Sequence, residues 1–154
     1  MHLPEKGVLL SPSVEVFRGG SDAGYRFKPE KVMLQAVVSM AMPNRNRHVK
    51  DYPLEARWDL RDYENLVRSK LEATTHAGAY VGADTFVIPD VGCGVFQNDP
   101  RIVGRLLGEV LRTQGSYFEE IILTGKEDFM QSCFQAAGQE ERWKQNKKSS
   151  YGVK

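Results

Sequence analysis

The chain has 154 residues, of which 41% are hydrophobic and 27% charged, and its formal net charge is +1. This composition predicts one globular domain with a hydrophobic core, and the small net charge would not recruit nucleic acid. The sequence contains no apolar stretch of the roughly 20 residues that a membrane span needs. Two cysteines and three histidines make neither a disulfide framework nor a metal-ligand pattern, so we expect no metal, no cofactor and a reduced, cytoplasmic compartment.

The first half of the chain contains an extended segment, a strand and a helix. Val8–Gly20 reads as extended, and Pro12 argues against a regular central strand there. Val32–Met42 is a nearly continuous apolar run that ends at Pro43, which is typical of a strand buried on both faces. From Glu55 to about His76, apolar residues recur three or four positions apart, and this spacing predicts a helix.

The second half alternates between short strands and helices. Asp84–Val91 is predicted as another buried strand, and Asp99 followed by Pro100 fits an N-cap and first residue of a helix. Glu119–Gly125 is predicted as a third strand, and Phe129–Ala137 as a last amphipathic helix. This alternation predicts an α/β sheet with helices on both faces.

Ligands bind to such sheets at the carboxyl ends of the strands. The loop Gly92–Asp99, "GCGVFQND", follows one of these ends. Gly92 and Gly94 would let backbone N–H groups converge on an anion, helped by the start of the next helix. Phe96 offers a face that would cover a sugar or a base. The alternative is a tight connection whose glycines serve geometry alone, since the loop matches no catalogued phosphate motif.

Several side chains near the strand ends have two interpretations each. Cys93 before a helix start is either a nucleophile, which would need His48 or His76 as a base, or a small packed residue. Asp90 is either a ligand-orienting group or base, or a partner of the loop's own backbone. Asn44 and Arg45 either contact a nucleotide or belong to a polar loop.

Three segments together resemble the microbial-type poly(ADP-ribose) glycohydrolase family, a branch of the macrodomain superfamily. They are "LLSPSVEVFRGG", "AMPNRN" and "GADTFVIPDVGCGVFQNDPRIVGRLLGEVL". The resemblance covers roughly residues 8–135, and "GCGVFQNDP" is its most specific part. It implies a three-layer α/β/α macrodomain-like fold with a mixed sheet, and ADP-ribose as the ligand.

The resemblance also implies roles for individual residues. Backbone amides of the loop would hold the diphosphate, and Phe96 would pack near the distal ribose. Asn98 would fix the loop or the helix start, whereas Pro43 and Asn44 would line the opposite wall. The implied ligand-binding residues are Gly92, Cys93, Gly94, Val95, Phe96, Asn98, Pro43 and Asn44.

One departure from the family concerns catalysis. The family carries a triple glycine and a Gln-Glu-Glu ahead of these motifs, and no such residues precede Val8. We therefore expect a sheet that is incomplete on its N-terminal side, in a fragment, half of a split protein or a short relative. An open sheet edge predicts a homodimer or a partner chain. Asp90 and Glu141, the latter in a "GQEE" that a permutation would bring to the site, are the candidate acids.

These observations predict a macrodomain-like domain over residues 1–143 and a flexible basic tail over 144–154. From Gly138 onward the chain has five Lys or Arg and two Glu. Three functions remain open: ADP-ribose binding without full glycohydrolase activity, glycohydrolysis with an acid from a partner or dimer mate, and a degenerate structural or interaction domain. We expect no membrane partner and no nucleic acid.

Overall fold

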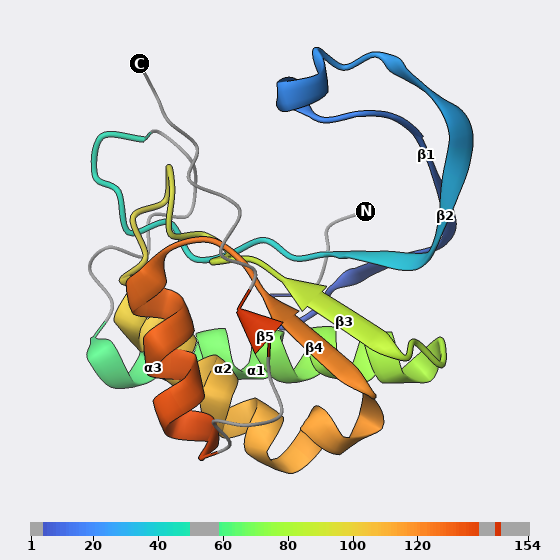
Figure 1. The fold of residues 1–154 in the computed structure, drawn as a ribbon. Helices are drawn as coiled ribbons and strands as arrows, with labels where there is room; N and C mark the ends of the chain where they lie inside the picture. The colour runs from blue at the N-terminus through green and yellow to red at the C-terminus, as the bar shows by residue number, and fades with distance from the viewer. Residues whose placement is uncertain (1–4, 50–58, 139–143, 146–154) are drawn as a thin grey trace.

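The structure is a computed structural model that describes residues 5–49, 59–138 and 144–145. Strands and helices alternate along most of it (Figure 1). Among the described residues, no helix is both long and apolar enough to cross a membrane. The elements are β1 (Leu9–Arg18), β2 (Phe27–Ser39), α1 (Leu60–Tyr80), β3 (Thr85–Ile88), α2 (Pro100–Gln114), β4 (Glu120–Leu123), α3 (Glu127–Ala137) and β5 (Lys144–Gln145).

A small parallel sheet of order β3-β4-β5 holds the core in place. β3 pairs with β4 in the register Thr85 to Glu120, and β5 adds to the other edge of β4. Side chains of β3 alternate between exposed and buried, with Phe86 and Ile88 inside. The prediction that this strand is buried on both faces is therefore wrong: Val87, at 56% exposure, faces outward. Lys144 and Gln145 of the basic 144–154 stretch form β5.

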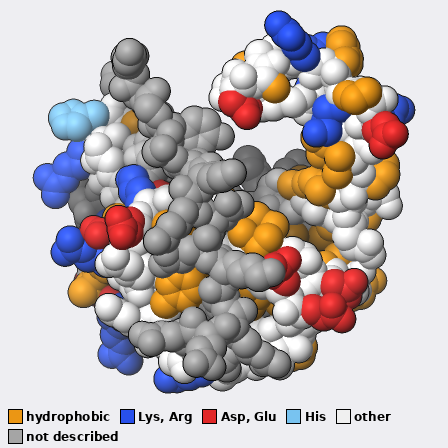
Figure 2. Space-filling view, in the orientation of Figure 1, with side chains coloured by type: hydrophobic (Ala, Val, Ile, Leu, Met, Phe, Trp, Pro, Cys, Tyr) orange, Lys and Arg blue, Asp and Glu red, His pale blue; other side chains and the backbone are white. Residues whose placement is uncertain are grey.

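β1 and β2 form a separate antiparallel ribbon that curves away from the rest of the fold (Figure 1). The expected extended segment over Val8–Gly20 is confirmed. The prediction of a fully buried strand over Val32–Met42 is wrong, because Met33 is 59% exposed and Val32 44%. An apolar run shows that a strand has two apolar faces; it does not show which element covers them. Figure 2 shows hydrophobic side chains along the inner side of this ribbon and around the hollow below it.

The predicted start of α2 at Asp99 and Pro100 is confirmed. The Asp99 carboxylate accepts a hydrogen bond of 2.8 Å from the Arg101 N–H at the start of α2, as expected of an N-cap. α1 begins at Leu60, later than predicted, because Asp59 caps it. Residues 55–58 of that prediction lie outside the described residues. α2 and α3 pack closely, since a Cβ added at Gly104 would lie 2.1 Å from the Phe129 carbonyl oxygen.

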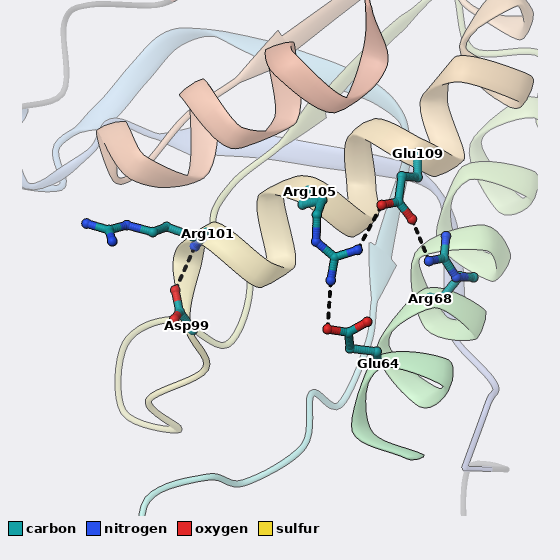
Figure 3. Close-up of polar contacts among 6 residues, drawn as sticks. All are labelled: Glu64, Arg68, Asp99, Arg101, Arg105 and Glu109. Carbon is teal, nitrogen blue, oxygen red and sulfur yellow. Dashed lines mark hydrogen bonds and ion pairs between the residues drawn. The ribbon is translucent and has the colours of Figure 1, made fainter. Parts of the chain in front are cut away.

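An ion-pair network joins α1 to α2 (Figure 3). The Arg105 guanidinium lies 2.7 Å from Glu64 and 2.8 Å from Glu109, and Glu109 also pairs with Arg68. Burial opposes ionisation of Glu109, but hydrogen bonds from both arginines outweigh it and hold the pKa of that carboxyl below its usual range. Because these side chains remain partly exposed, the network contributes modestly to stability and mainly fixes how the helices cross.

Candidate functional site

The loops that follow β2 and β3 meet and are cross-bonded. The Arg45 N–H donates to the Phe96 carbonyl at 2.9 Å, and the Asn46 side-chain amide donates to the Val95 carbonyl at 2.8 Å. Both loops therefore lie at the carboxyl ends of their strands, as the alternation of strands and helices predicted. In α/β folds this is the edge at which ligands bind.

Asn98 connects the two loops to α1. It is only 2% exposed, and its side-chain amide donates to the carbonyls of Pro43, at 3.0 Å, and Gly92, at 2.9 Å. Its side-chain oxygen accepts from the Tyr63 hydroxyl at 2.9 Å. Burial raises the pKa of that hydroxyl, which therefore stays a hydrogen-bond donor at physiological pH. Asn98 thus holds the loop from behind and has no remaining polar atom for a ligand.

The backbone of the Gly92–Phe96 loop presents unused donors. Among the described residues, the N–H groups of Gly92, Gly94, Val95 and Phe96 donate no hydrogen bond. Gly92 has a φ of +74°, and a Cβ there would lie 2.6 Å from both Asn98 Nδ2 and Met42 Cβ. The position therefore requires glycine for its conformation and for the approach of the loop after β2. A cluster of free N–H groups at the start of a helix is suited to an anion.

Cys93 lies under this loop and faces the core. It is 2% exposed, and its Sγ is 3.7 Å from the Val91 carbonyl. Burial, and then the charge of Asp90, raise the pKa of the thiol to about 12, although the nearby Lys126 ammonium opposes this. A thiol with such a pKa is protonated at neutral pH and is not a nucleophile. The geometry therefore favours the interpretation of Cys93 as a packed residue.

The turn after β4 brings two charged groups to the same edge. Lys126 Nζ donates to the Cys93 carbonyl, which places an ammonium beside the loop. The Asp90 carboxylate packs against Gly125, where an added Cβ would lie 2.2 Å from Asp90 Oδ1. Sequence reasoning missed Lys126, although its place one residue after a predicted strand end was a usable signal. Glu141, the other candidate acid, lies outside the described residues.

The loop after β2 is held in place by buried residues and by its own hydrogen bonds. Pro43 and Asn44 are buried, and the Asn44 side chain bonds within its own loop, to the Asn46 N–H at 2.9 Å and the Val49 carbonyl at 3.2 Å. Asn46, which the sequence analysis did not single out, makes the link to Val95. Phe96 is half-buried and packs partly on the core, whereas Val95 is 70% exposed.

Comparisons with known proteins bear on the fold. Neither the family models nor the curated proteins contain a match to the sequence. Among solved structures, poly(ADP-ribose) glycohydrolase from Deinococcus radiodurans in complex with ADP-ribose aligns with a TM-score of 0.67 and 20% identity, over 85% of this chain and 52% of that one. Its apo form gives the same TM-score and identity, and covers 53% of that chain. The enzyme from Thermomonospora curvata gives 0.63 and 23%, over 83% of this chain and 46% of that one.

These alignments confirm the predicted mixed α/β, macrodomain-like fold and the likeness to poly(ADP-ribose) glycohydrolases at the level of structure. At 20% to 23% identity they establish the fold and leave function to be argued from the site. The chain therefore has the fold of microbial poly(ADP-ribose) glycohydrolases, and it spans about half the length of the solved enzymes that it matches.

Proposed function

We propose that this chain binds ADP-ribose, or a related nucleotide diphosphate, on the backbone of the Gly92–Phe96 loop. The observation that carries the proposal is the set of four loop N–H groups without an acceptor among the described residues. They lie next to the start of α2, whose dipole favours negative charge. The solved Deinococcus enzyme of the same fold is a complex with ADP-ribose.

The neighbouring groups fit a diphosphate in charge and in shape. Lys126 supplies a cation beside the loop. Gly94 is exposed, and an added Cβ there would meet no atom within 4 Å, so a phosphate can approach the loop backbone. The two exposed or half-exposed apolar side chains, Val95 and Phe96, would cover the ribose. Backbone N–H groups do not titrate, so we expect the contribution of the loop to affinity to change little between pH 6 and 8.

Calorimetric titration with ADP-ribose tests the proposal directly. Gly94→Glu puts a carboxylate where the phosphates would lie. The substitution causes no steric clash at Cβ in the free protein, because an added Cβ meets no atom within 4 Å. We expect at least about a tenfold loss of affinity, because a like charge opposes the anion, with an unchanged melting temperature. Ser116→Glu adds the same charge at an exposed position in the turn that follows the C-terminal end of α2 and is the matched control. Absence of heat at millimolar ADP-ribose, or equal affinities for both variants, would reject the loop as the site.

Glycohydrolysis is a second candidate function, and the position of Asp90 is the observation that favours it. A glycosidic bond is cleaved with the help of a carboxylic acid near the leaving oxygen, and Asp90 brings a carboxyl to the loop edge. The test is release of ADP-ribose from poly(ADP-ribose) by the parent chain and by the Asp90→Asn and Glu141→Gln variants. Turnover that either variant abolishes supports an acid in this chain. Zero turnover in the parent, with ADP-ribose still bound, restricts the function to binding.

A further inference from the structure

A cleft of about 570 Å³ separates β2 from β3. Six consecutive residues of β2 and the residue after them, Leu34–Met40, form one wall, and β3 with the residue after it, Thr85–Pro89, forms the other. Side chains of a strand alternate between its faces, so a cleft lined by every residue in a run faces the backbone edge of that strand. The cleft is therefore bounded by the backbone edges of β2 and β3, which face each other.

Neither of these edges is paired in the part of the chain that the structure describes. β2 pairs with β1 on its other side, and β3 pairs with β4 on its other side. No β1 or β4 residue lines the cleft. Thr74, Gly78 and Val81 at the end of α1 form part of the remaining lining, and the Gln35 side chain bonds the Val81 carbonyl at 2.7 Å. Unpaired strand edges of this kind accept another strand.

Several large hydrophobic side chains along the ribbon and on β3 are exposed, and three of them, Leu34, Val37 and Val87, line the cleft. The exposed large hydrophobic residues of the ribbon and β3 are Leu9, Phe17, Phe27, Val32, Met33, Leu34, Val37 and Val87. Figure 2 shows hydrophobic side chains around this hollow. Exposed apolar side chains that gather around a cleft are typical of an interaction site, and a two-stranded ribbon is marginally stable unless another element packs on it.

We propose that one strand of a different polypeptide, and not of a second copy of this chain, inserts between β2 and β3 and joins the two sheets into one. The occupant must have both edges free. Each described strand of this chain already uses at least one edge, so the described strands of a second copy do not meet that requirement. The inserted strand carries apolar side chains on at least one face, to match Val37 and Val87. The solved enzymes of this fold are about twice as long as the part that aligns, so further polypeptide accompanies the fold there.

The inserted strand would also reach the candidate site. β2 leads into the loop that carries Asn46, and β3 leads into the loop that carries Val95, and these two loops are bonded to each other. A strand between β2 and β3 therefore ends beside both loops and presents its terminal residues to a ligand there. The two walls are roughly 16 to 23 Å long at ~3.3 Å per residue, which fits a strand of five to seven residues.

A synthetic peptide with the sequence Lys-Val-Thr-Val-Thr-Val-Lys, capped at both ends and labelled, tests the two-edged geometry by fluorescence anisotropy. Successive N–H groups of a strand point to opposite edges. One derivative is N-methylated at residues 2, 4 and 6, and a second at residues 3 and 5. We expect saturable binding of the parent peptide and at least about tenfold weaker binding of both derivatives, since each loses several backbone hydrogen bonds. A single open edge would still bind either derivative through its intact edge, and that result overturns the proposal.

Variants of the protein show whether the peptide binds in the cleft. Val37→Lys with Val87→Lys adds charge at two exposed positions that line the cleft, and Leu60→Lys with Tyr117→Lys adds it at exposed apolar positions elsewhere. We expect about a tenfold loss for the first pair and a change within about twofold for the second. Equal effects of the two pairs, or no saturable binding of the parent peptide, overturn the proposal.

Two further readouts separate this inference from its alternatives. Light scattering that shows a dimer of the parent chain, broken by Val37→Lys with Val87→Lys, would place a second copy in the cleft and overturn the proposal. The peptide assay contains no nucleotide, so its failure leaves ADP-ribose binding untouched. Failure of the ADP-ribose titration likewise leaves strand insertion standing.

Discussion

Asn98 offers the sharpest test of how the site is held together. Asn98→Ala removes three hydrogen bonds of a buried side chain, of 2.9 Å from the Tyr63 hydroxyl, 3.0 Å to the Pro43 carbonyl and 2.9 Å to the Gly92 carbonyl. A buried hydrogen bond contributes about 1 kcal/mol net, and each partner left unsatisfied adds a desolvation cost. We expect the free energy of unfolding to fall by about 3 kcal/mol, a large part of the 5–15 kcal/mol of a typical domain.

Urea unfolding followed by circular dichroism measures this loss, and Asn65→Ala is the matched control. Asn65 is an exposed residue of α1, so its replacement should change the free energy of unfolding by less than about 0.5 kcal/mol. Because the Asn98 amide anchors both loops, we also expect Asn98→Ala to weaken ADP-ribose binding at temperatures where the protein is folded.

A double-mutant cycle shows whether the bonds act as one unit. Tyr63→Phe removes a single hydroxyl and should cost about 1 kcal/mol. In the Asn98→Ala background the same change should cost almost nothing, because its acceptor is already gone. A loss below 1 kcal/mol for Asn98→Ala, or full additivity of the two changes, would refute the reasoning that Asn98 anchors the loops.

Three further predictions concern the packing and charges of the fold. Gly104→Ala should lower the free energy of unfolding, measured by urea denaturation, by about 2 kcal/mol despite the better helix propensity of alanine. The reason is that the new Cβ would lie 2.1 Å from a backbone oxygen of α3. Unchanged stability would show that α2 and α3 separate easily. Burial raises the thiol pKa of Cys93 and of Cys133 from 9.0 to about 12. Because the thiols of the unfolded state ionise first, the free energy of unfolding should fall as pH rises from about 9 toward 12. A free energy of unfolding that stays constant over that pH range would contradict the burial of both thiols. Despite partial burial, hydrogen bonds from Arg68 and Arg105 lower the pKa of Glu109, and the stability that this contributes is lost as pH falls below about 4.5. Glu109→Gln should therefore make the free energy of unfolding less dependent on pH in this acid range. The same acid transition in the variant and in the parent chain would contradict this prediction.

The parts of the fold that the sequence predicted are those with local causes. Asp99 and Pro100 fix the start of α2 through contacts within a few residues, and the structure confirms them. The apolar run Val32–Met42 identified a strand but not its surroundings, because the covering element is set by residues distant in sequence or on another chain. The same limit made β3 look buried on both faces, although Val87 is exposed.

The features of the candidate site likewise differ in whether they have a local cause in the sequence. The glycines of the loop carry a local signal, and the structure places the unused N–H groups there. The bond from Tyr63 to Asn98 spans 35 positions, and that from Lys126 to the Cys93 carbonyl spans 33. No periodicity reveals such pairs, because each depends on how α1 and β4 pack against β3.

The open cleft and the candidate ligand loop are mechanically connected, because β2 and β3 each lead from the cleft into one of the two cross-bonded loops. The bond between Asn46 and Val95 fixes the loops relative to each other, while among the described residues no strand pairing fixes β2 relative to β3. A strand that fills the cleft would restrict the distance between the two strands and so the shape of the loop edge. If both proposals hold, strand insertion and nucleotide binding are therefore coupled. Thermodynamic linkage requires the coupling to be reciprocal: the factor by which the strand raises ADP-ribose affinity equals the factor by which ADP-ribose raises the affinity for the strand.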